Sequence, residues 1–318
     1  MTDPVVLPET AAVLEFLAAQ EGPHLADLTA MEMREVFRQL GDVFDLPPDP
    51  SVRTVDFEGA GSPLRAYFPD LAKAGPVIVY MHGGGWVIGD LTTHDALCRL
   101  IAVISGFRVV AVEYGLAPEH GFPRAHKDCL AAAEFIAASP VELEAPVTGI
   151  GVAGDSAGGN LAFHVAAKLT HSKPLAQFLI YPVGDCSSPA EGSYVQFEAG
   201  YLLDRKLMDR FISDYLPDPA ATVHRDASPL LHPIATGLPP TVILTAGLDP
   251  LRDQGRALAG QLIAQGTETH YIEAEGLIHG MATMRKSLPT AEAIVRRATA
   301  IFAELIRAEE GKREEPQA

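Results

Sequence analysis

The chain has 318 residues, of which 47% are hydrophobic and 20% are charged, so it has the composition of a globular protein with a large core and not of a disordered one. Its formal net charge of −17, from 24 Lys and Arg against 41 Asp and Glu, argues against nucleic acid and anionic membranes as partners, because both need a basic surface. Three widely spaced cysteines predict neither a disulfide framework nor a zinc site, and no secretory signal is visible, so we expect a soluble, cytoplasmic protein.

The first 46 residues are predicted to be helical. One helix is expected over 10–20 and a second from Thr29, which has the capping-box spacing with Glu32. The apolar residues of this second helix recur at the spacing of one helical face, at Met33, Val36, Phe37 and Leu40. The run Leu46-Pro47-Pro48-Asp49-Pro50 then ends helix formation.

The remaining chain alternates between strand-like and helical runs. A β-hairpin is expected first, formed by 52–57 and 64–68 with its turn at 59–61. Further strands are expected over 77–81, 107–114, 149–153, 176–181, 241–246 and 269–273, and helices over 94–104, 124–138, 157–169, 251–265 and 285–308. Such alternation predicts an α/β fold with a mostly parallel central sheet flanked by helices. The stretch 184–240 contains one clear helix, 204–215, and no clear strand, which indicates an insertion.

The strongest chemical signal is Gly154-Asp155-Ser156-Ala157-Gly158, a G-x-S-x-G between a strand and a helix. A sharp strand-to-helix turn exposes the serine Oγ, and the flanking glycines remove Cβ atoms that would clash there. The alternative is a glycine-rich connection that happens to contain a serine, but the strand–turn–helix context favours Ser156 as a nucleophile.

A second glycine pattern overlaps this motif. Gly149, Gly151 and Gly154 have the G-x-G-x-x-G spacing of a dinucleotide site. That fingerprint has to follow its strand, whereas these glycines begin or lie within it, and no acidic residue stands about 20 residues later. We therefore interpret the pattern as coincidence.

Backbone N–H groups for an oxyanion are expected from His82-Gly83-Gly84-Gly85-Trp86, which directly follows the 77–81 strand. The N–H groups of Gly83, Gly84 and Ala157 are the candidates, since glycines let the backbone approach a substrate oxygen closely. His82 precedes the nucleophile and is expected to order the loop instead of acting as base.

A base and an acid are expected after the nucleophile. Asp249 follows the 241–246 strand, and His279 follows the 269–273 strand by a short loop, so both would meet Ser156 at one sheet edge. Asp253 is the main rival acid, but it lies in the following helix and is expected to face solvent or support the site.

Together these residues resemble the hormone-sensitive-lipase-like bacterial carboxylesterases of the α/β-hydrolase superfamily. The matching motifs are HGGGW at 82–86, Tyr114 with 116–120 and Phe122-Pro123, GDSAGGN at 154–160, DPLRD at 249–253 and His279-Gly280. The resemblance implies an α/β-hydrolase fold that uses a Ser-His-Asp triad and an acyl-enzyme to hydrolyse short-to-medium acyl esters of small molecules, with no metal or organic cofactor. It also implies N-terminal cap helices over 1–46, a catalytic core over 47–183 and 223–308, and a cap insertion over 184–222. We expect a disordered tail over 309–318. Related esterases are often dimers, so a homodimer is also expected.

Specificity is less determined by the sequence. The candidates for lining the substrate pocket are Trp86, Asp155, Tyr181, Phe197 and Tyr201. The chain departs from the family pattern at Gly115, Gln254 and Met281, where the family usually has Arg, Glu and Phe. An amidase, deacetylase or lactonase on the same triad stays open, as does a non-catalytic ligand receptor, which the presence of His279 disfavours.

Overall fold

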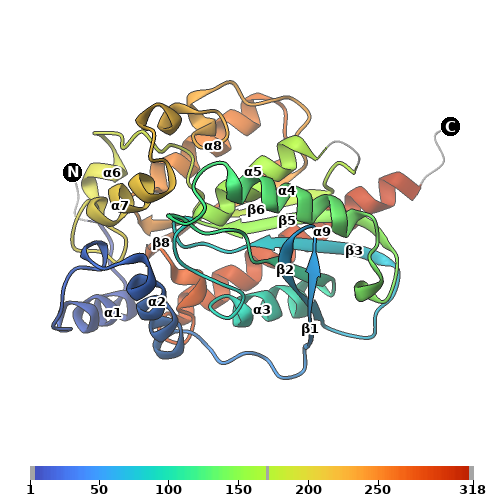
Figure 1. The fold of residues 1–318 in the computed structure, drawn as a ribbon, viewed down its shortest axis with the longest axis horizontal. Helices are drawn as coiled ribbons and strands as arrows, with labels where there is room; N and C mark the ends of the chain where they lie inside the picture. The colour runs from blue at the N-terminus through green and yellow to red at the C-terminus, as the bar shows by residue number, and fades with distance from the viewer. Residues whose placement is uncertain (1–3, 170–171, 315–318) are drawn as a thin grey trace.

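The computed structural model describes residues 4–169 and 172–314, which form an eight-stranded sheet with helices on both faces (Figure 1). The strand order is β1-β2-β4-β3-β5-β6-β7-β8. The β1–β2 and β2–β4 pairs are antiparallel, and all pairs from β4 to β8 are parallel. The mostly parallel α/β sheet predicted from the alternation of elements is thereby confirmed.

The strands are β1 Arg53–Gly59, β2 Ser62–Phe68, β3 Gly75–Met81, β4 Arg108–Val112, β5 Val147–Asp155, β6 Ala176–Ile180, β7 Thr241–Leu248 and β8 Thr269–Ile278. The helices are α1 Pro8–Ala18, α2 Ala30–Phe44, α3 Asp95–Ser105, α4 Arg124–Ala137, α5 Ala157–Lys168, α6 Ser193–Gln196, α7 Arg205–Tyr215, α8 Arg252–Ala264 and α9 Pro289–Glu314. Short 3₁₀ turns occupy Leu25–Asp27, Val141–Leu143, Pro219–Val223, Pro229–Leu231 and Met281–Thr283.

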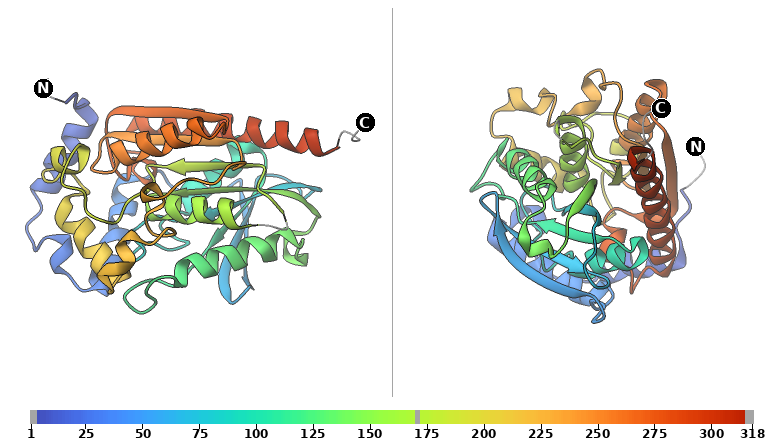
Figure 2. Two further views of the ribbon diagram at one scale, coloured as in Figure 1. Left: turned by 90° about the horizontal axis from the view of Figure 1, so that it is seen from above. Right: turned by 90° about the vertical axis from the view of Figure 1, so that its right-hand side faces the viewer.

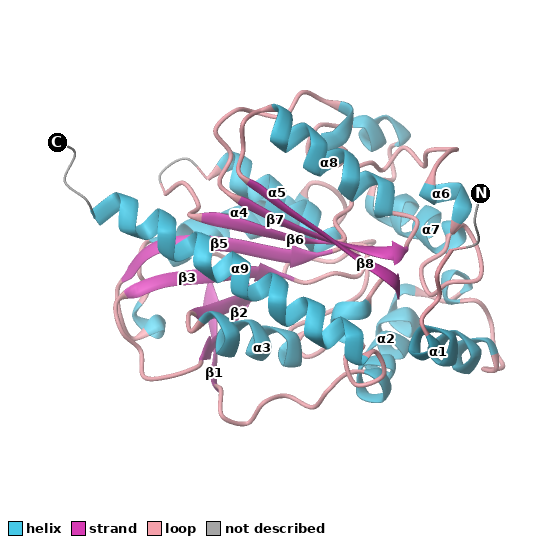
Figure 3. Ribbon diagram, turned by 180° about the vertical axis from the view of Figure 1, so that it is seen from behind, coloured by secondary structure: helices cyan, strands magenta, loops and turns pink. Residues whose placement is uncertain are grey.

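The central strands are buried on both faces, because helices cover both. Along β3, Val77, Val79 and Met81 pack with residues of α4 and α5, whereas Ile78 and Tyr80 pack with residues of α3 and α9. Figure 3 shows α3 and α9 together on the second face. This two-sided burial explains why the strand reads as a continuous apolar run in place of an alternating one.

The two segments predicted to form a cap, which we call the cap segments (4–46 and 184–222), lie together beyond the carboxyl ends of the parallel strands (Figure 2). Lys206 of α7 pairs with Asp27 at 2.6 Å, and the Arg210 guanidinium donates to the carbonyls of Ala26 and Leu28 at 3.0 Å. The connection between α1 and α2 is therefore bonded directly to α7.

A buried ion pair attaches the C-terminus of α2 to the segment that follows β8. Asp45, at the C-terminus of α2, accepts hydrogen bonds at 2.9 Å from two nitrogens of the Arg285 guanidinium. Arg285 follows His279 by six residues, so this pair fastens one cap segment to the loop that carries His279.

Two elements extend further than the sequence indicated. Strand β8 continues past Glu273 to Ile278, because its pairing with β7 resumes at Leu248 and Ile278 after a register shift in which β8 has the extra residues. His279 thus follows its strand directly. Helix α9 begins at Pro289, a residue favoured in the first turn, and continues to Glu314, so the disorder predicted over 309–318 is wrong for 309–314. Residues 315–318 lie outside the described part.

Candidate active site

Ser156 occupies a strained turn between β5 and α5. Its backbone has φ 56° and ψ −119°, a conformation that is rare for a residue with a side chain. The glycines on either side are sterically required: a Cβ on Gly154 would lie 2.2 Å from the carbonyl oxygen of Gly158, and one on Gly158 would lie 2.0 Å from that of Met81. The turn projects the serine from the end of the strand, as the G-x-S-x-G pattern predicts.

A chain of hydrogen bonds joins Ser156, His279 and Asp249. The Nε2 of His279 is 2.9 Å from the Ser156 Oγ, and its Nδ1 is 2.7 Å from the Asp249 Oδ2. Asp249 is 0% exposed, and its other oxygen accepts the Leu251 N–H at 2.8 Å. The carboxylate is therefore held in one orientation by its own loop and by the imidazole.

The rival acid Asp253 lies elsewhere. Its side chain is 39% exposed and contacts Arg252 and Arg256, each at 3.0 Å, while accepting the Ser193 N–H at 2.8 Å. These partners, with burial opposing them, lower its pKa. Asp253 thus anchors the start of α6 and does not meet His279.

The oxyanion loop differs from the prediction at one residue. The N–H of Gly83 donates to Asp155 Oδ1 at 2.8 Å, so it is already occupied. By contrast, the N–H groups of Gly84, Gly85 and Ala157 donate to no protein acceptor within the described residues, and Gly84 and Gly85 line the cavity beside Ser156. The Gly83 N–H is therefore not free to receive an oxyanion, whereas the N–H of Gly85, the third glycine of the motif, is free beside that of Gly84 in the described part of the chain.

Close packing explains why this loop contains three glycines. A Cβ on Gly83 would lie 2.3 Å from Asp155 Oδ2, and one on Gly85 would lie 2.2 Å from the Cγ of Phe211 in α7. On Gly84 the Cβ would lie 2.2 Å from the carbonyl oxygen of Ile88. The loop is thus clamped between the carboxylate that precedes Ser156 and a ring from the second cap segment.

A buried charged network supports the loop. Asp155 Oδ1 accepts the Tyr80 hydroxyl at 2.7 Å as well as the Gly83 N–H, and it lies 3.3 Å from His94 Nε2. Burial acts to raise the pKa of Asp155, but His94 and these hydrogen bonds lower it overall. Burial acts to lower the pKa of His94, and the Asp155 carboxylate raises it overall. Asp155 is therefore an ionised anchor.

His82 is part of the support and not of the chemistry. Its ring stacks on Tyr114 with centroids 4.2 Å apart, and its Nδ1 is 2.8 Å from the Gly83 carbonyl. Burial, followed by the neighbouring His94, lowers the pKa of His82 to about 4. A neutral imidazole inside the loop agrees with the ordering role expected for it.

An apolar cavity, open to solvent, lies over Ser156 and His279. Both cap segments supply walls. Its lining residues are Leu25, Phe37, Leu40, Gly41, Phe44, Gly84, Gly85, Trp86, Ile88, Thr93, Asp155, Ser156, Val183, Leu202, Leu203, Leu207, Met208, Phe211, His279, Gly280, Thr283 and Met284. The cap residues among them were not singled out from the sequence, because apolar residues of a helix have the same pattern whether they face a core or a cavity.

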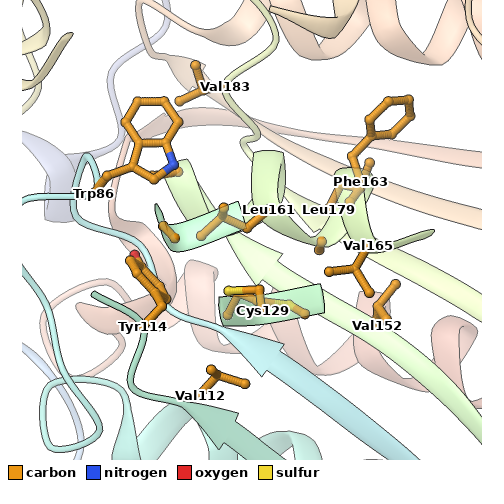
Figure 4. Close-up of a cluster of buried hydrophobic side chains, with 14 of the residues drawn as sticks. Trp86, Val112, Tyr114, Cys129, Val152, Leu161, Phe163, Val165, Leu179 and Val183 are labelled. Atoms are coloured by element: carbon orange, nitrogen blue, oxygen red, sulfur yellow. The ribbon is translucent and has the colours of Figure 1, made fainter. Parts of the chain in front are cut away.

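Two of the five predicted pocket residues line this cavity, Trp86 and Asp155. Trp86 stacks on Tyr215 at 4.5 Å, and together with Val183 it joins the cavity to the buried cluster beneath it (Figure 4). Tyr181, Phe197 and Tyr201 do not line it. The ring of Tyr181 packs at 4.5 Å against that of His279, and Phe197 packs edge-on against Tyr201 at 5.2 Å.

The three departures from the family pattern have identifiable surroundings. The Gln254 amide oxygen accepts the N–H groups of Gly184 and Asp185, so it holds the start of the second cap segment. The Gly115 N–H donates to Asp128, and Met281 is fully buried after the His279 loop. None of these three residues takes part in the hydrogen bonds that join Ser156, His279 and Asp249.

The described residues contain no cluster of three or more His, Cys, Asp or Glu side chains arranged to hold a metal ion. Over the same ranges, no helix combines the length and apolar character needed to cross a bilayer.

A family model described as alpha/beta hydrolase fold matches residues 78–283 of the chain. The carboxylesterase NlhH of Mycobacterium tuberculosis is 35% identical over 92% of this chain and 95% of its own length. An ethyl acetate hydrolase of Pseudomonas putida is 34% identical over 90% and 94%. The crystal structure of a Ser161Ala mutant of an alpha/beta hydrolase enzyme from the metagenome of Lake Arreo superposes with a TM-score of 0.88 at 36% identity, covering 94% and 98% of the two chains.

Proposed function

Since this chain belongs to the α/β-hydrolase fold family, in its hormone-sensitive-lipase-like branch, we propose that it works as a serine carboxylesterase through Ser156, His279 and Asp249. The family and its carboxylesterase relatives support ester hydrolysis as the activity. The assignment of these residues rests on one observation: a chain of hydrogen bonds runs from Ser156 Oγ through both ring nitrogens of His279 to Asp249, and its Ser156 end faces an apolar cavity.

The proposed reaction is acyl transfer in two halves. The Ser156 Oγ attacks the ester carbonyl while its proton passes to His279 Nε2, and the Asp249 carboxylate stabilises the resulting imidazolium. The carbonyl oxygen becomes an oxyanion that accepts from the N–H groups of Gly84, Gly85 and Ala157, the last at the N-terminus of α5. Collapse breaks the ester C–O bond, and His279 returns the proton to the leaving alcohol.

The second half releases the acid. Water gives a proton to His279 and attacks the acyl-enzyme, and the same N–H groups hold the second oxyanion. The Ser156–acyl bond then breaks, the proton returns to Ser156, and the carboxylic acid leaves. Each cycle consumes one ester and one water, and Ser156, His279 and Asp249 return to their starting states.

The charge of the cavity supports neutral esters as substrates. Among its described lining residues, neither a lysine nor an arginine is present, and Asp155 contributes a carboxylate beside Ser156. A carboxylate on the substrate would find no lysine or arginine in the lining to pair with, and His94 is already paired with Asp155 at 3.3 Å. We expect neutral short-to-medium acyl esters to react faster than their carboxylate-bearing analogues of equal length.

A hydrolysis panel of p-nitrophenyl esters from acetate to palmitate tests the proposal. Ser156→Ala is expected to lower kcat by 10³-fold or more, typical for loss of a nucleophile, without loss of fold. The wild-type protein mixed with a slowly turned-over ester is expected to gain the mass of one acyl group on Ser156. Matched p-nitrophenyl esters and anilides compare ester with amide hydrolysis, and an anilide rate equal to the ester rate would contradict carboxylesterase function.

We also propose that the enzyme is located in the cytoplasm. Cys98, Cys129 and Cys186 are buried thiols outside any disulfide in the described part of the chain, as suits a reducing cytoplasm. Cell fractionation tests that location. A homodimer stays a prediction, which analytical ultracentrifugation tests.

A further inference from the structure

Helix α2 has a glycine in its cavity wall where a side chain is expected. Phe37, Leu40, Gly41 and Phe44 of this helix all line the cavity, at the i, i+3, i+4 and i+7 spacing of one face. A glycine inside a helix is less favourable than alanine because it loses more backbone entropy on folding. Gly41 lies three residues before the end of α2, so it is not a C-terminal cap.

The space above Gly41 is empty of protein. A Cβ built at Gly41 meets no heavy atom within 4 Å, although the glycine is only partly exposed and both of its neighbours on this face, Phe37 and Phe44, are large. The glycine therefore leaves a notch in the wall between two aromatic side chains. No close packing against backbone, of the kind found at Gly83–Gly85, requires a glycine here.

The other cap segment faces the same cavity with large apolar side chains. Leu207, Met208 and Phe211 of α7, with Leu202 and Leu203 before it, complete the lining on that side. Figures 1 and 3 show α2 and α7 at the same end of the molecule. From Phe37 to Phe44 the α2 wall runs about 10 Å along the helix axis, at 1.5 Å per residue. The wall is therefore about as long as an extended apolar chain of several carbons.

We propose that the notch at Gly41 receives an apolar chain of the ester substrate and sets the chain length that the enzyme accepts. The inference rests on the proposed esterase function, because Ser156 and Gly41 line one cavity. We expect a short acyl group such as acetyl to end before the notch, and longer chains to contact Phe37, Phe44 and the α7 side. Gly41 thus determines specificity and takes no part in the acyl transfer.

The test fills the notch in steps with Gly41→Ala and Gly41→Leu. Gly260 supplies the matched control, since it lies inside α8, also has no atom within 4 Å of a built Cβ, and is remote from the cavity lining. Rates are measured on p-nitrophenyl acetate, butanoate, hexanoate and octanoate, and on acetates of alcohols of rising length. An active-site titration with a phosphonate gives the concentration of competent enzyme.

For Gly41→Leu we expect the ratio of kcat/KM on the longest substrates of one series to kcat/KM on acetate to fall roughly tenfold or more, the size typical of lost or blocked methylene contacts. The series affected identifies whether the acyl or the alkoxy chain lies against α2. Gly41→Ala is expected to lose less on long chains and to raise Tm by roughly 1–3 °C. Gly260→Leu is expected to keep the wild-type length profile.

An unchanged ratio of long-chain to acetate rates in both folded Gly41 variants would overturn the inference, and so would an equal loss on every substrate, which indicates a blocked entrance. If Gly41→Leu does not fold, Gly41→Ala and Gly41→Val carry the comparison. A wild-type protein that hydrolyses none of the esters would instead overturn the proposed function, so the two failures are distinguishable.

Discussion

Replacing Asp155 by asparagine removes the charge that anchors the oxyanion loop. In the wild-type protein one Asp155 oxygen accepts the Tyr80 hydroxyl at 2.7 Å and the Gly83 N–H at 2.8 Å, with His94 Nε2 at 3.3 Å. Asparagine keeps an oxygen at this position, so both hydrogen bonds persist in neutral form. The charge assistance and the attraction to His94 are lost.

The magnitude follows from these contacts. A hydrogen bond to a charged group is about twice as strong as a neutral one, so each of the two bonds loses roughly 1 kcal/mol, and the lost attraction to His94 adds about as much. We therefore expect Asp155→Asn to lower the free energy of unfolding by about 3 kcal/mol near pH 5. At roughly 2–4 °C per kcal/mol, Tm falls by about 6–12 °C. Because Gly83 is less firmly held, kcat is expected to fall roughly 10- to 100-fold.

The pH dependence identifies the cause. The pKa of Asp155 is lowered from 3.8, so its contribution is present above that value and is lost as pH falls through the folded-state pKa. The pKa of His94 is raised from 6.5, so its contribution is full below 6.5 and is lost as pH rises through the folded-state pKa. The stability difference between wild type and Asp155→Asn is therefore expected to be largest between about pH 4 and 6.5.

The assay is urea unfolding of both proteins from pH 3 to 8, with kcat measured at pH 7. Tyr80→Phe is the matched control, since it removes one hydrogen bond to the same oxygen and leaves both charges in place. Its cost of roughly 1–2 kcal/mol is expected to vary little between pH 5 and 8. A difference for Asp155→Asn that is equally constant over this range would refute the charged Asp155–His94 pair.

Two other contacts give sharp expectations. Asp45→Asn leaves the buried Arg285 guanidinium with Glu292, at 3.5 Å, as its remaining ion-pair partner among the described residues. We expect the free energy of unfolding, measured in urea, to fall by roughly 2–4 kcal/mol, and a fall under 1 kcal/mol would contradict this. The double variant with Arg285→Met is expected to recover part of the lost stability. Tyr181→Leu removes the ring that packs at 4.5 Å against the imidazole of His279, so the imidazole is held less firmly and kcat is expected to fall roughly tenfold. Tyr181→Phe keeps the ring and is expected to keep kcat, so equal kcat values for the Leu and Phe variants would argue against a positioning role for the ring contact.

Local features of the chain were accessible from the sequence because their causes are local. At Gly154 the requirement for glycine is local, since the clashing oxygen belongs to Gly158 of the same turn, whereas at Gly158 the clashing oxygen belongs to Met81 on the neighbouring strand β3. The continuous apolar runs of the parallel strands predicted the sheet because both faces are covered by helices. Chain order alone then directed Asp249 and His279 toward the sheet edge that carries Ser156.

The oxyanion loop and the cavity were decided by tertiary contacts. Which glycine N–H is free depends on the Asp155 carboxylate, 72 residues away, which occupies Gly83 and leaves Gly84 and Gly85 open. Tyr181 and Phe197 are buried against other rings and not against the cavity, a choice that a sequence pattern does not encode.

The sequence by itself determined the fold class and the turn that carries the nucleophile, because backbone sterics and hydrophobic periodicity act over a few residues. The tertiary structure alone decided how far β8 extends, which amides face the cavity and where a missing side chain at Gly41 leaves space. These depend on atoms that segments distant in the chain bring together, so no local pattern records them.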